Sequence, residues 1–181
     1  IHDLHQLPIR QGLVCAQKHA GILVAGGRDL DGAACVGRLA LVSAQLAETS
    51  DATLLGSALG RSGEGRICAG RVFRVREPLQ VYRVWDGAKA NTFGEWWALE
   101  PPRGDREGYR RDYAVCPEWN VLDHLVACTL RPGATIVLGP GQSATCADRT
   151  YEKSPMTQIF IKGRQEDIRA QMEACASTPW P

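Results

Sequence analysis

The sequence predicts an α+β fold, and two patterns carry that prediction. Between residues 81 and 161, five short segments rich in β-branched and aromatic residues alternate with Gly, Pro, Asn and Asp, as strands alternate with turns. The stretches 33–59 and 165–175 instead repeat apolar residues at helical spacing. We therefore expect a sheet in the second half of the chain, preceded by a helical segment and followed by one helix.

Composition limits the class of protein. The chain has 181 residues, of which 44% are hydrophobic and 23% charged, which is typical of one soluble domain, with or without a small appendage. No apolar run approaches the roughly 18 residues that a membrane-spanning helix needs. The formal net charge is +1, so electrostatics gives no basis for binding nucleic acid or an anionic membrane. We expect neither partner.

Seven cysteines are present, and none belongs to a C-x-x-C pair, so a zinc ribbon or a thioredoxin-like site is not expected. The number is odd, which leaves at least one thiol free or joined to another chain. The sequence favours one or more disulfides, among Cys116, Cys128 and Cys146; buried free thiols are the alternative. No metal site is predicted.

The first part of the chain is expected to be mainly helical. Residues 13–25 suit a strand or a short helix, and the next stretch suits two helices, over 32–48 and 51–60, with Asp51 as the N-cap of the second. A membrane-inserting hairpin of these two helices is the less favoured alternative. The chain begins at Ile1 and not at Met, which indicates a fragment or a processed form.

A glycine-rich stretch, GRSGEGR at 60–66, reads as a linker or an exposed loop. It lacks the G-K-[S/T] ending of a phosphate-binding loop. We place a domain boundary here, between an N-terminal segment 1–65 and a second unit 66–181.

Residues 66–87 alternate apolar and polar side chains, with Pro78 dividing them into two strands or bending one edge strand. Arg83 lies in the middle of the second strand with apolar neighbours on both sides. Such an arginine is either a surface residue of an edge strand or a half-buried guanidinium that binds phosphate in a cleft.

Two adjacent tryptophans, Trp96 and Trp97, form the next element. In a strand they point to opposite faces, one into the core and one toward solvent or a ligand. An exposed indole suits stacking against a planar ring. Four of the five tryptophans fall between Trp85 and Trp119, so this region is where we expect a ligand surface.

The remaining elements are short. Residues 110–115, which include Arg110 and Arg111, alternate like a strand, and 121–130 suit a strand or a short helix. An R-P-G turn leads to a strand over 134–138, a long loop follows, and 157–161 form the final strand, which carries Gln158. A helix over 165–175 packs back on the sheet.

Three of these segments, Tyr82–Trp85, Gly94–Trp97 and Thr157–Ile161, occur in an order that resembles the ADP-ribosyltransferase-like fold, and in particular the NAD-glycohydrolase toxins of the tuberculosis necrotizing toxin type. The resemblance spans roughly residues 80–163. It implies a small split β-sheet that holds NAD in a cleft, with 66–181 as the NAD-binding domain. The chain lacks the family's Ser-Thr-Ser triplet and its E-x-E pair, and it lacks tandem glycines before Gln158.

The resemblance implies roles for individual residues, and NAD as the substrate with no metal. Gln158 and Arg83 would be catalytic. Gln158, or the nearby Glu95, would accept hydrogen bonds from the ribose hydroxyls, and Arg83 would bind the pyrophosphate. The remaining candidates would bind the substrate, the aromatic ones by stacking on nicotinamide and the basic ones through phosphate: Tyr82, Trp96, Trp97, Arg110 and Arg111. Because the E-x-E pair is what the family uses for transfer to protein arginine, its absence favours NAD hydrolysis.

Other functions stay open at this point. The same fold can make an ADP-ribosyltransferase that modifies protein or nucleic acid, and a disulfide-bearing, non-enzymatic binding module is a third hypothesis. A nuclease toxin, with His19 and His124 as its histidines, is a fourth, less favoured because no acid–base pair is evident. A toxin reading implies a secreted or injected effector that acts in the target-cell cytoplasm, and a cognate immunity protein as partner.

Overall fold

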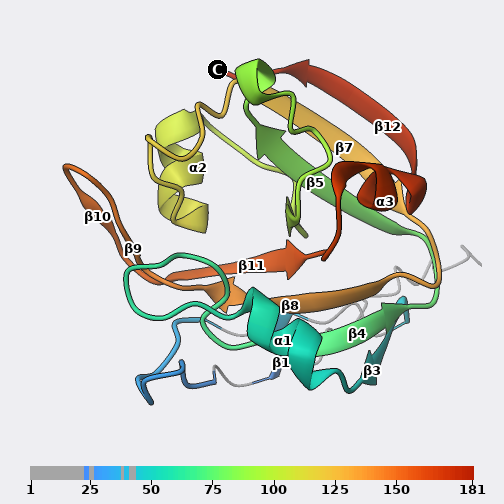
Figure 1. The fold of residues 1–181 in the computed structure, drawn as a ribbon, viewed down its shortest axis with the longest axis horizontal. Coiled ribbons are helices and arrows are strands. Elements are labelled where there is room, and N and C mark those ends of the chain that lie inside the picture. The colour runs from blue at the N-terminus through green and yellow to red at the C-terminus, as the bar shows by residue number, and fades with distance from the viewer. Residues whose placement is uncertain (1–22, 25–26, 38, 41–43) are drawn as a thin grey trace, which may run out of the picture.

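The computed structural model describes residues 23–24, 27–37, 39–40 and 44–181. The fold is α+β, as the sequence predicts. Eight strands form one sheet in the order β12-β7-β5-β6-β11-β8-β4-β3, and every neighbouring pair is antiparallel (Figure 1). Within the described residues no helix is long and apolar enough to cross a membrane.

The strands of this sheet are short. In chain order they are β3 (Leu46–Thr49), β4 (Arg71–Val75), β5 (Leu79–Trp85), β6 (Trp96–Ala98), β7 (His124–Leu130), β8 (Thr135–Gly141), β11 (Ser154–Phe160) and β12 (Met172–Pro179). Two small ribbons pair β1 (Leu23–Val24) with β2 (Leu39–Ala40) and β9 (Ala144–Thr145) with β10 (Thr150–Tyr151). The α-helices are α1 (Ala52–Ala58), α2 (Arg106–Tyr113) and α3 (Gln165–Ala170), and a 3-10 turn covers Gly87–Lys89.

The sheet opens between β5 and β6. These two strands pair at a single position, Tyr82 with Ala98, whereas β5 pairs with β7 along its whole length. Beyond Tyr82 the strands separate, and Figure 1 shows β12, β7 and β5 running across the direction of β11, β8 and β4. The opening leaves the later residues of β5 without a strand partner on one side, which makes room for a cleft.

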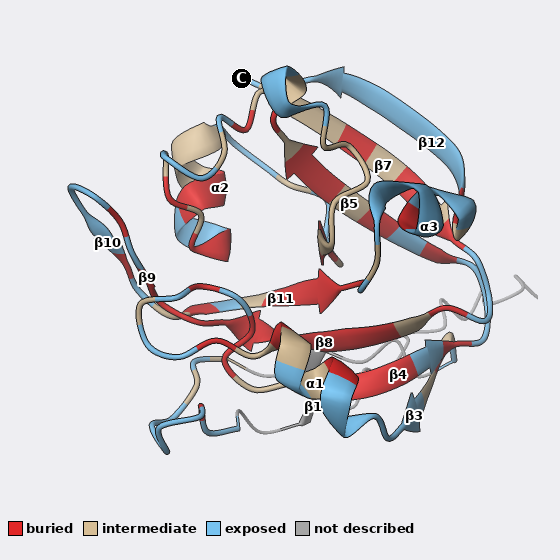
Figure 2. Ribbon diagram, viewed as in Figure 1, coloured by how far each residue is buried: buried red, intermediate tan, exposed pale blue. Residues whose placement is uncertain are grey.

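One core joins the two halves of the sheet. Val81 and Val126 come from one half, and Trp97, Ile136 and Ile159 come from the other, all nearly inaccessible to solvent. Figure 2 shows buried stretches on the strands of both halves. Burying side chains of this size stabilises the fold by roughly 1.5 to 3 kcal/mol each. The core therefore fixes how the two halves meet, and with them the width of the opening.

The three helices cover different parts of the sheet. α1 packs Leu54 and Ala58 against β4 and β8. α3 contacts β12 and buries Ile168 in the shared core. α2 lies on β11 and places two tyrosines, Tyr109 and Tyr113, beside the opening. Of the three, α2 is therefore the helix that shapes the cleft.

The predicted helix over 51–60 is confirmed as α1, and its N-cap is Asp51, whose Oδ1 accepts a hydrogen bond from Leu54 N at 2.9 Å. The predicted helix over 32–48 is wrong. Leu39–Ala40 and Leu46–Thr49 are strands, and 41–43 lie outside the described residues. β3 pairs with the free edge of β4, so backbone pairing outweighs the local helix propensity. The prediction for 13–25 falls almost entirely outside the described residues.

The predicted strand over 110–115 is also wrong, because the chain forms helix α2 up to Tyr113. Asp105 caps that helix by accepting a hydrogen bond from Gly108 N at 2.8 Å. Tyr109 and Tyr113, four residues apart, then lie on one face and are both buried. The spacing of apolar residues in this short segment fits a strand as well as a helix. The helix is formed because it buries both tyrosines on one face.

The predicted helix over 165–175 ends early. α3 stops at Ala170, and the following residues form β12, which pairs with β7 at the edge of the sheet. The strand predictions do better: Pro78 separates β4 from β5, 121–130 contain β7, and 157–161 match β11 closely. The long loop after β8 contains the β9–β10 ribbon.

Within the described residues three disulfides are present: Cys35–Cys68, Cys116–Cys146 and Cys128–Cys175. The expectation of a bridge among Cys116, Cys128 and Cys146 is confirmed for one pair, and Cys128 bonds instead to a residue of β12. Cys15 lies outside the described residues.

β3 and α1 pack on the same sheet as the later elements, and the domain boundary at 65/66 stays a prediction.

Candidate active site

A cleft of about 360 Å³ lies where β5 and β6 part. This size falls within the range of small-molecule sites. Its lining combines a cation, amides and aromatic rings: Arg83, Asn91, Trp96, Tyr109, Tyr113 and Gln158. Further lining residues come from two loops, Glu64 and Arg66 from one and Trp119 and Asn120 from the other. The two residues predicted to be catalytic, Arg83 and Gln158, thus line one cleft, with Trp96 on the strand between them.

Arg83 is a buried cation with no acidic partner. Its side chain is 7% exposed, and its guanidinium donates only to main-chain carbonyls: Nη1 to Trp96 O at 2.8 Å, and Nε and Nη2 to Asn91 O at 3.2 and 3.1 Å. No carboxylate among the described residues lies within ion-pair distance of it. A guanidinium has five N–H groups, so two remain for a ligand.

Burial lowers the pKa of Arg83 to about 10, which still leaves it charged at neutral pH. A buried charge without a counter-ion is costly, and an anionic ligand would offset that cost. The electrostatics of the cleft therefore favours an anion beside Arg83, and the planar guanidinium suits the oxygens of a phosphate.

Gln158 presents an amide oxygen to the same cleft. The residue is 5% exposed, and its Nε2 donates to Tyr113 O at 3.0 Å, which ties β11 to the end of α2. No described residue donates a hydrogen bond to Oε1. In the sheet Gln158 lies between Ala98 and Gly139, whose small size leaves room around the amide. Oε1 is thus available to accept a hydrogen bond from a hydroxyl group of a ligand.

The two tryptophans of β6 point in opposite directions, as the sequence predicts. Trp97 is 2% exposed, belongs to the core and donates from its indole Nε1 to Gly94 O at 2.8 Å. Trp96 is half-buried, packs on Phe160 with 4.7 Å between ring centroids and presents its remaining surface to the cleft. Trp96 is therefore the ring available for stacking.

Three other predicted binding residues lie outside the cleft lining. Tyr82 packs half-buried near Val84 and Ala98. Arg110 donates from Nη1 and Nη2 to the carbonyls of Val115 and Val121, both at 3.3 Å, and so holds the loop after α2. Arg111 is exposed, with Nη1 4.0 Å from Glu107 Oε1. In helix α2 both arginines contact the helix or the loop after it, outside the cleft lining.

Several residues that line the cleft were not predicted from the sequence. Tyr109 and Tyr113 line the cleft because 106–113 is helical, and their i,i+4 spacing was the available signal. The loop 60–66, interpreted as a linker, contributes Glu64 and Arg66. It comes so close to Trp119 that a Cβ on Gly65 would lie 3.1 Å from that indole. The two loops together form the rim of the cleft.

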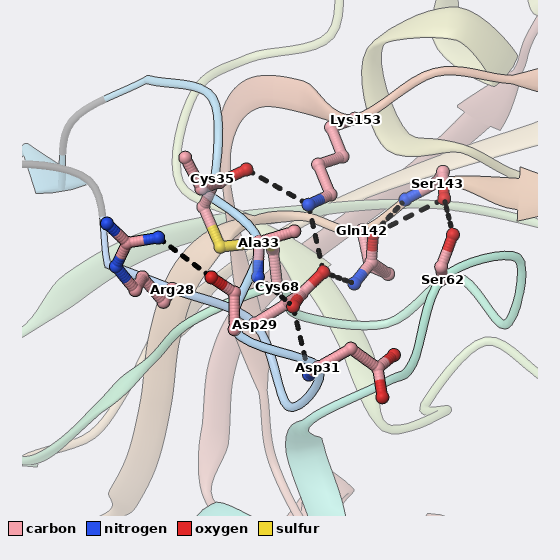
Figure 3. A network of polar contacts seen from close by, with 12 residues as sticks. Arg28, Asp29, Asp31, Ala33, Cys35, Ser62, Cys68, Gln142, Ser143 and Lys153 are labelled. Atoms are coloured by element: carbon pink, nitrogen blue, oxygen red, sulfur yellow. Dashed lines mark hydrogen bonds and ion pairs between the residues drawn. A yellow bond between two sulfur atoms is a disulfide. The ribbon is translucent and has the colours of Figure 1, made fainter.

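A buried polar network holds the loop 60–66 in place (Figure 3). Gln142, fully buried, donates from Nε2 to Gly60 O at 3.1 Å and to Asp29 Oδ2 at 3.2 Å. Lys153 Nζ lies 2.9 Å from the same Asp29 oxygen, and this contact holds the pKa of Asp29 well below its usual range. Ser143 Oγ accepts a hydrogen bond from Gly63 N at 3.0 Å. The network thus fixes one wall of the cleft.

Within the described residues, one group of side chains has metal-ligand spacing: Cys116, Glu118 and Cys146. The two sulfurs are bonded to each other in a disulfide, so they are not thiolate ligands. This group does not form a metal centre in the oxidised protein.

Comparison with protein-family models finds no match, and neither does comparison with curated proteins. Among solved structures, one described as the structure of Tne2 in complex with Tni2 is similar to this chain. The similarity covers 67% of this chain and 98% of that chain, with a TM-score of 0.48 and 14% sequence identity. A likeness of that extent assigns no activity to the chain.

Proposed function

We propose that the cleft binds NAD and cleaves its nicotinamide–ribose bond, so that the protein acts as an NAD glycohydrolase. One observation carries the proposal: Arg83, buried without a carboxylate, and Gln158, with a free amide oxygen, line one cleft together with the indole of Trp96. The substrate offers a matching set of groups, namely a pyrophosphate, ribose hydroxyls and a planar cationic ring.

Each group of the cleft has a task in this reaction. Arg83 binds the pyrophosphate and fixes the dinucleotide. Trp96 stacks on the nicotinamide ring. Gln158 Oε1 accepts a hydrogen bond from a ribose hydroxyl, an interaction that strengthens as positive charge develops on the ribose in an oxocarbenium-like transition state.

The bond changes balance without a metal or a second cofactor. The C1′–N1 bond breaks with its electron pair on the ring nitrogen, so nicotinamide leaves as a neutral molecule. Water adds to C1′ and loses one proton to solvent, which gives ADP-ribose. Because the leaving group needs no protonation, no general acid is required, and the described cleft residues include no histidine.

The resemblance to NAD-glycohydrolase toxins supports the same reading and extends it to a secreted or injected effector with a cognate immunity protein. Three disulfides fit a protein that passes through an oxidising compartment. Action in the target-cell cytoplasm, where NAD is available, completes this proposal.

The disulfides also favour a second candidate, a non-enzymatic binding module stabilised by cross-links. The two candidates differ in what they predict for NAD. A binding module releases no nicotinamide, whereas a glycohydrolase produces nicotinamide and free ADP-ribose in equal amounts.

Incubation of the purified, oxidised chain with ring-labelled and adenine-labelled NAD separates these outcomes. We expect nicotinamide release by the wild type, and a loss of about 10²-fold or more in kcat for Gln158→Ala. Glu77→Gln, which changes an exposed residue outside the cleft, is the matched control. An adenine label bound covalently to protein or nucleic acid indicates a transferase instead. No turnover by the wild type, or equal turnover by Gln158→Ala, contradicts the proposal.

A further inference from the structure

A second buried donor lines the cleft with Arg83. Tyr109, on α2, is 6% exposed and packs beside Val84, the residue after Arg83. Its ring lies 4.5 Å from that of Tyr113, centroid to centroid, which fixes its orientation. No described residue accepts a hydrogen bond from its hydroxyl, and the side chain lines the cleft. A buried tyrosine usually has a partner for its hydroxyl, so this one is available to a ligand.

The charge of Arg83 acts on this hydroxyl. Burial has the largest effect and raises the pKa of Tyr109 to about 12, helped by Asp112, while Arg83 and the main-chain N–H of Val84 oppose this increase by favouring the phenolate form. The hydroxyl therefore keeps its proton at neutral pH. It can donate that proton in a hydrogen bond close to where the guanidinium attracts negative charge.

We propose that Tyr109 and Arg83 together bind one phosphate group, the helix supplying a hydroxyl donor and the strand supplying the two remaining N–H groups of the guanidinium. In NAD this group is part of the pyrophosphate. The assignment rests on the proposed function only for the identity of the ligand; the anion site itself rests on the two side chains. The Tyr109 hydroxyl and the two free N–H groups of Arg83 make three hydrogen-bond donors, which match the several acceptor oxygens of a phosphate. The phosphate would also neutralise the charge of Arg83.

Tyr113 is the contrasting residue. It lines the same cleft and is equally buried, and burial, Tyr109, Glu100 and Asp112 all raise its pKa without an opposing effect of Arg83. Tyr109 packs beside Val84, the residue after Arg83, so we place the phosphate on the Tyr109 side of this pair. Removal of either hydroxyl is the same chemical change in two electrostatic environments, which makes the pair a matched comparison.

The test measures binding by calorimetry with ADP-ribose and with inorganic pyrophosphate, for the wild type and three tyrosine-to-phenylalanine variants. We expect Tyr109→Phe to raise the Kd of both ligands about tenfold or more, since it removes a hydrogen bond to a charged group. We expect Tyr82→Phe, outside the cleft, to stay within about twofold, and Tyr113→Phe to lose less affinity than Tyr109→Phe. Melting temperatures verify that each variant folds.

The outcomes separate this inference from the proposed function. An unchanged Kd for Tyr109→Phe, or a larger loss for Tyr113→Phe, overturns the phosphate clamp. Failure of the wild type to bind either ligand also overturns it. A Tyr109-dependent Kd in a wild type that releases no nicotinamide supports the clamp and contradicts NAD hydrolysis.

Discussion

At the scale of single residues, one buried guanidinium, that of Arg83, is the main determinant of the proposed ligand binding in the cleft. Position 83 was ambiguous in the sequence, because its pattern fits both a surface arginine of an edge strand and a half-buried guanidinium in a cleft. In the structure the side chain is buried and donates hydrogen bonds to main-chain carbonyls. No described carboxylate neutralises its charge. Sequence alone could not show this, since the absence of a nearby carboxylate depends on residues distant along the chain.

The charge state of Arg83 gives a pH prediction. Burial lowers its pKa to about 10 while the pKa of Tyr109 is raised to about 12, so as pH rises the guanidinium loses its proton first. We expect the affinity for ADP-ribose to stay level from about pH 7 to 9 and to fall as pH passes through 10. Calorimetry across this range measures it. An affinity that stays level to pH 11 in a protein that is still folded contradicts the role of Arg83.

At the scale of elements, the cleft is a product of the gap between β5 and β6 and of two loops that close over it. The sequence predicted the strands that carry Arg83, Trp96 and Gln158, because alternation and turn residues are local signals. It did not predict α2 or the strands before α1, because capping by Asp105 and pairing with a free sheet edge decide those segments. The residues contributed by α2 and by loop 60–66 were missed for the same reason.

The segment before β6 tests this geometry. A Cβ on Gly94 would lie 2.6 Å from Cζ of Arg83, so Gly94→Ala should displace the guanidinium. We expect at least a tenfold loss of ADP-ribose affinity in a folded protein, because the obstructed group is the end of a flexible side chain. Gly56→Ala, in an open position of α1, is the control and should add roughly 0.5 to 1 kcal/mol of stability with no change in affinity. Equal affinity in both variants would contradict the geometry.

At the scale of the whole molecule, three disulfides join segments that are distant in sequence. Cys116–Cys146 ties the loop after α2 to the β9–β10 ribbon, and Cys128–Cys175 ties β7 to β12 at the sheet edge. The first holds a wall of the cleft and the second does not. The seven cysteines indicated cross-links, but the pairing depends on the tertiary fold.

Removal of each bridge by paired Cys→Ala changes should lower the free energy of unfolding by about 3 to 4 kcal/mol in both cases. We expect only the loss of Cys116–Cys146 to weaken ADP-ribose binding, because Trp119 and Asn120 then lose their support. Denaturant unfolding and calorimetry on the two variants measure the two effects. A loss of affinity from the Cys128–Cys175 variant alone is the contradictory result.

The ion pair between buried Asp29 and half-buried Lys153 gives a second prediction at this scale. Because the folded-state pKa of Asp29 lies below its unfolded value near 4, its contribution to stability is present above about pH 4 and lost as pH falls further. We expect Asp29→Asn to melt below the wild type at pH 7, with the difference shrinking below pH 4. A difference that is the same at pH 3 and pH 7 would show that the charge contributes nothing.

The central claim is that the opening between β5 and β6 holds the dinucleotide. A crystal structure of the oxidised protein with ADP-ribose tests it most directly. The account predicts a phosphate within hydrogen-bond distance of the Arg83 guanidinium and the Tyr109 hydroxyl, and a ribose hydroxyl within that distance of Gln158 Oε1. ADP-ribose bound at another surface, with Arg83 contacting only main-chain carbonyls, would contradict it.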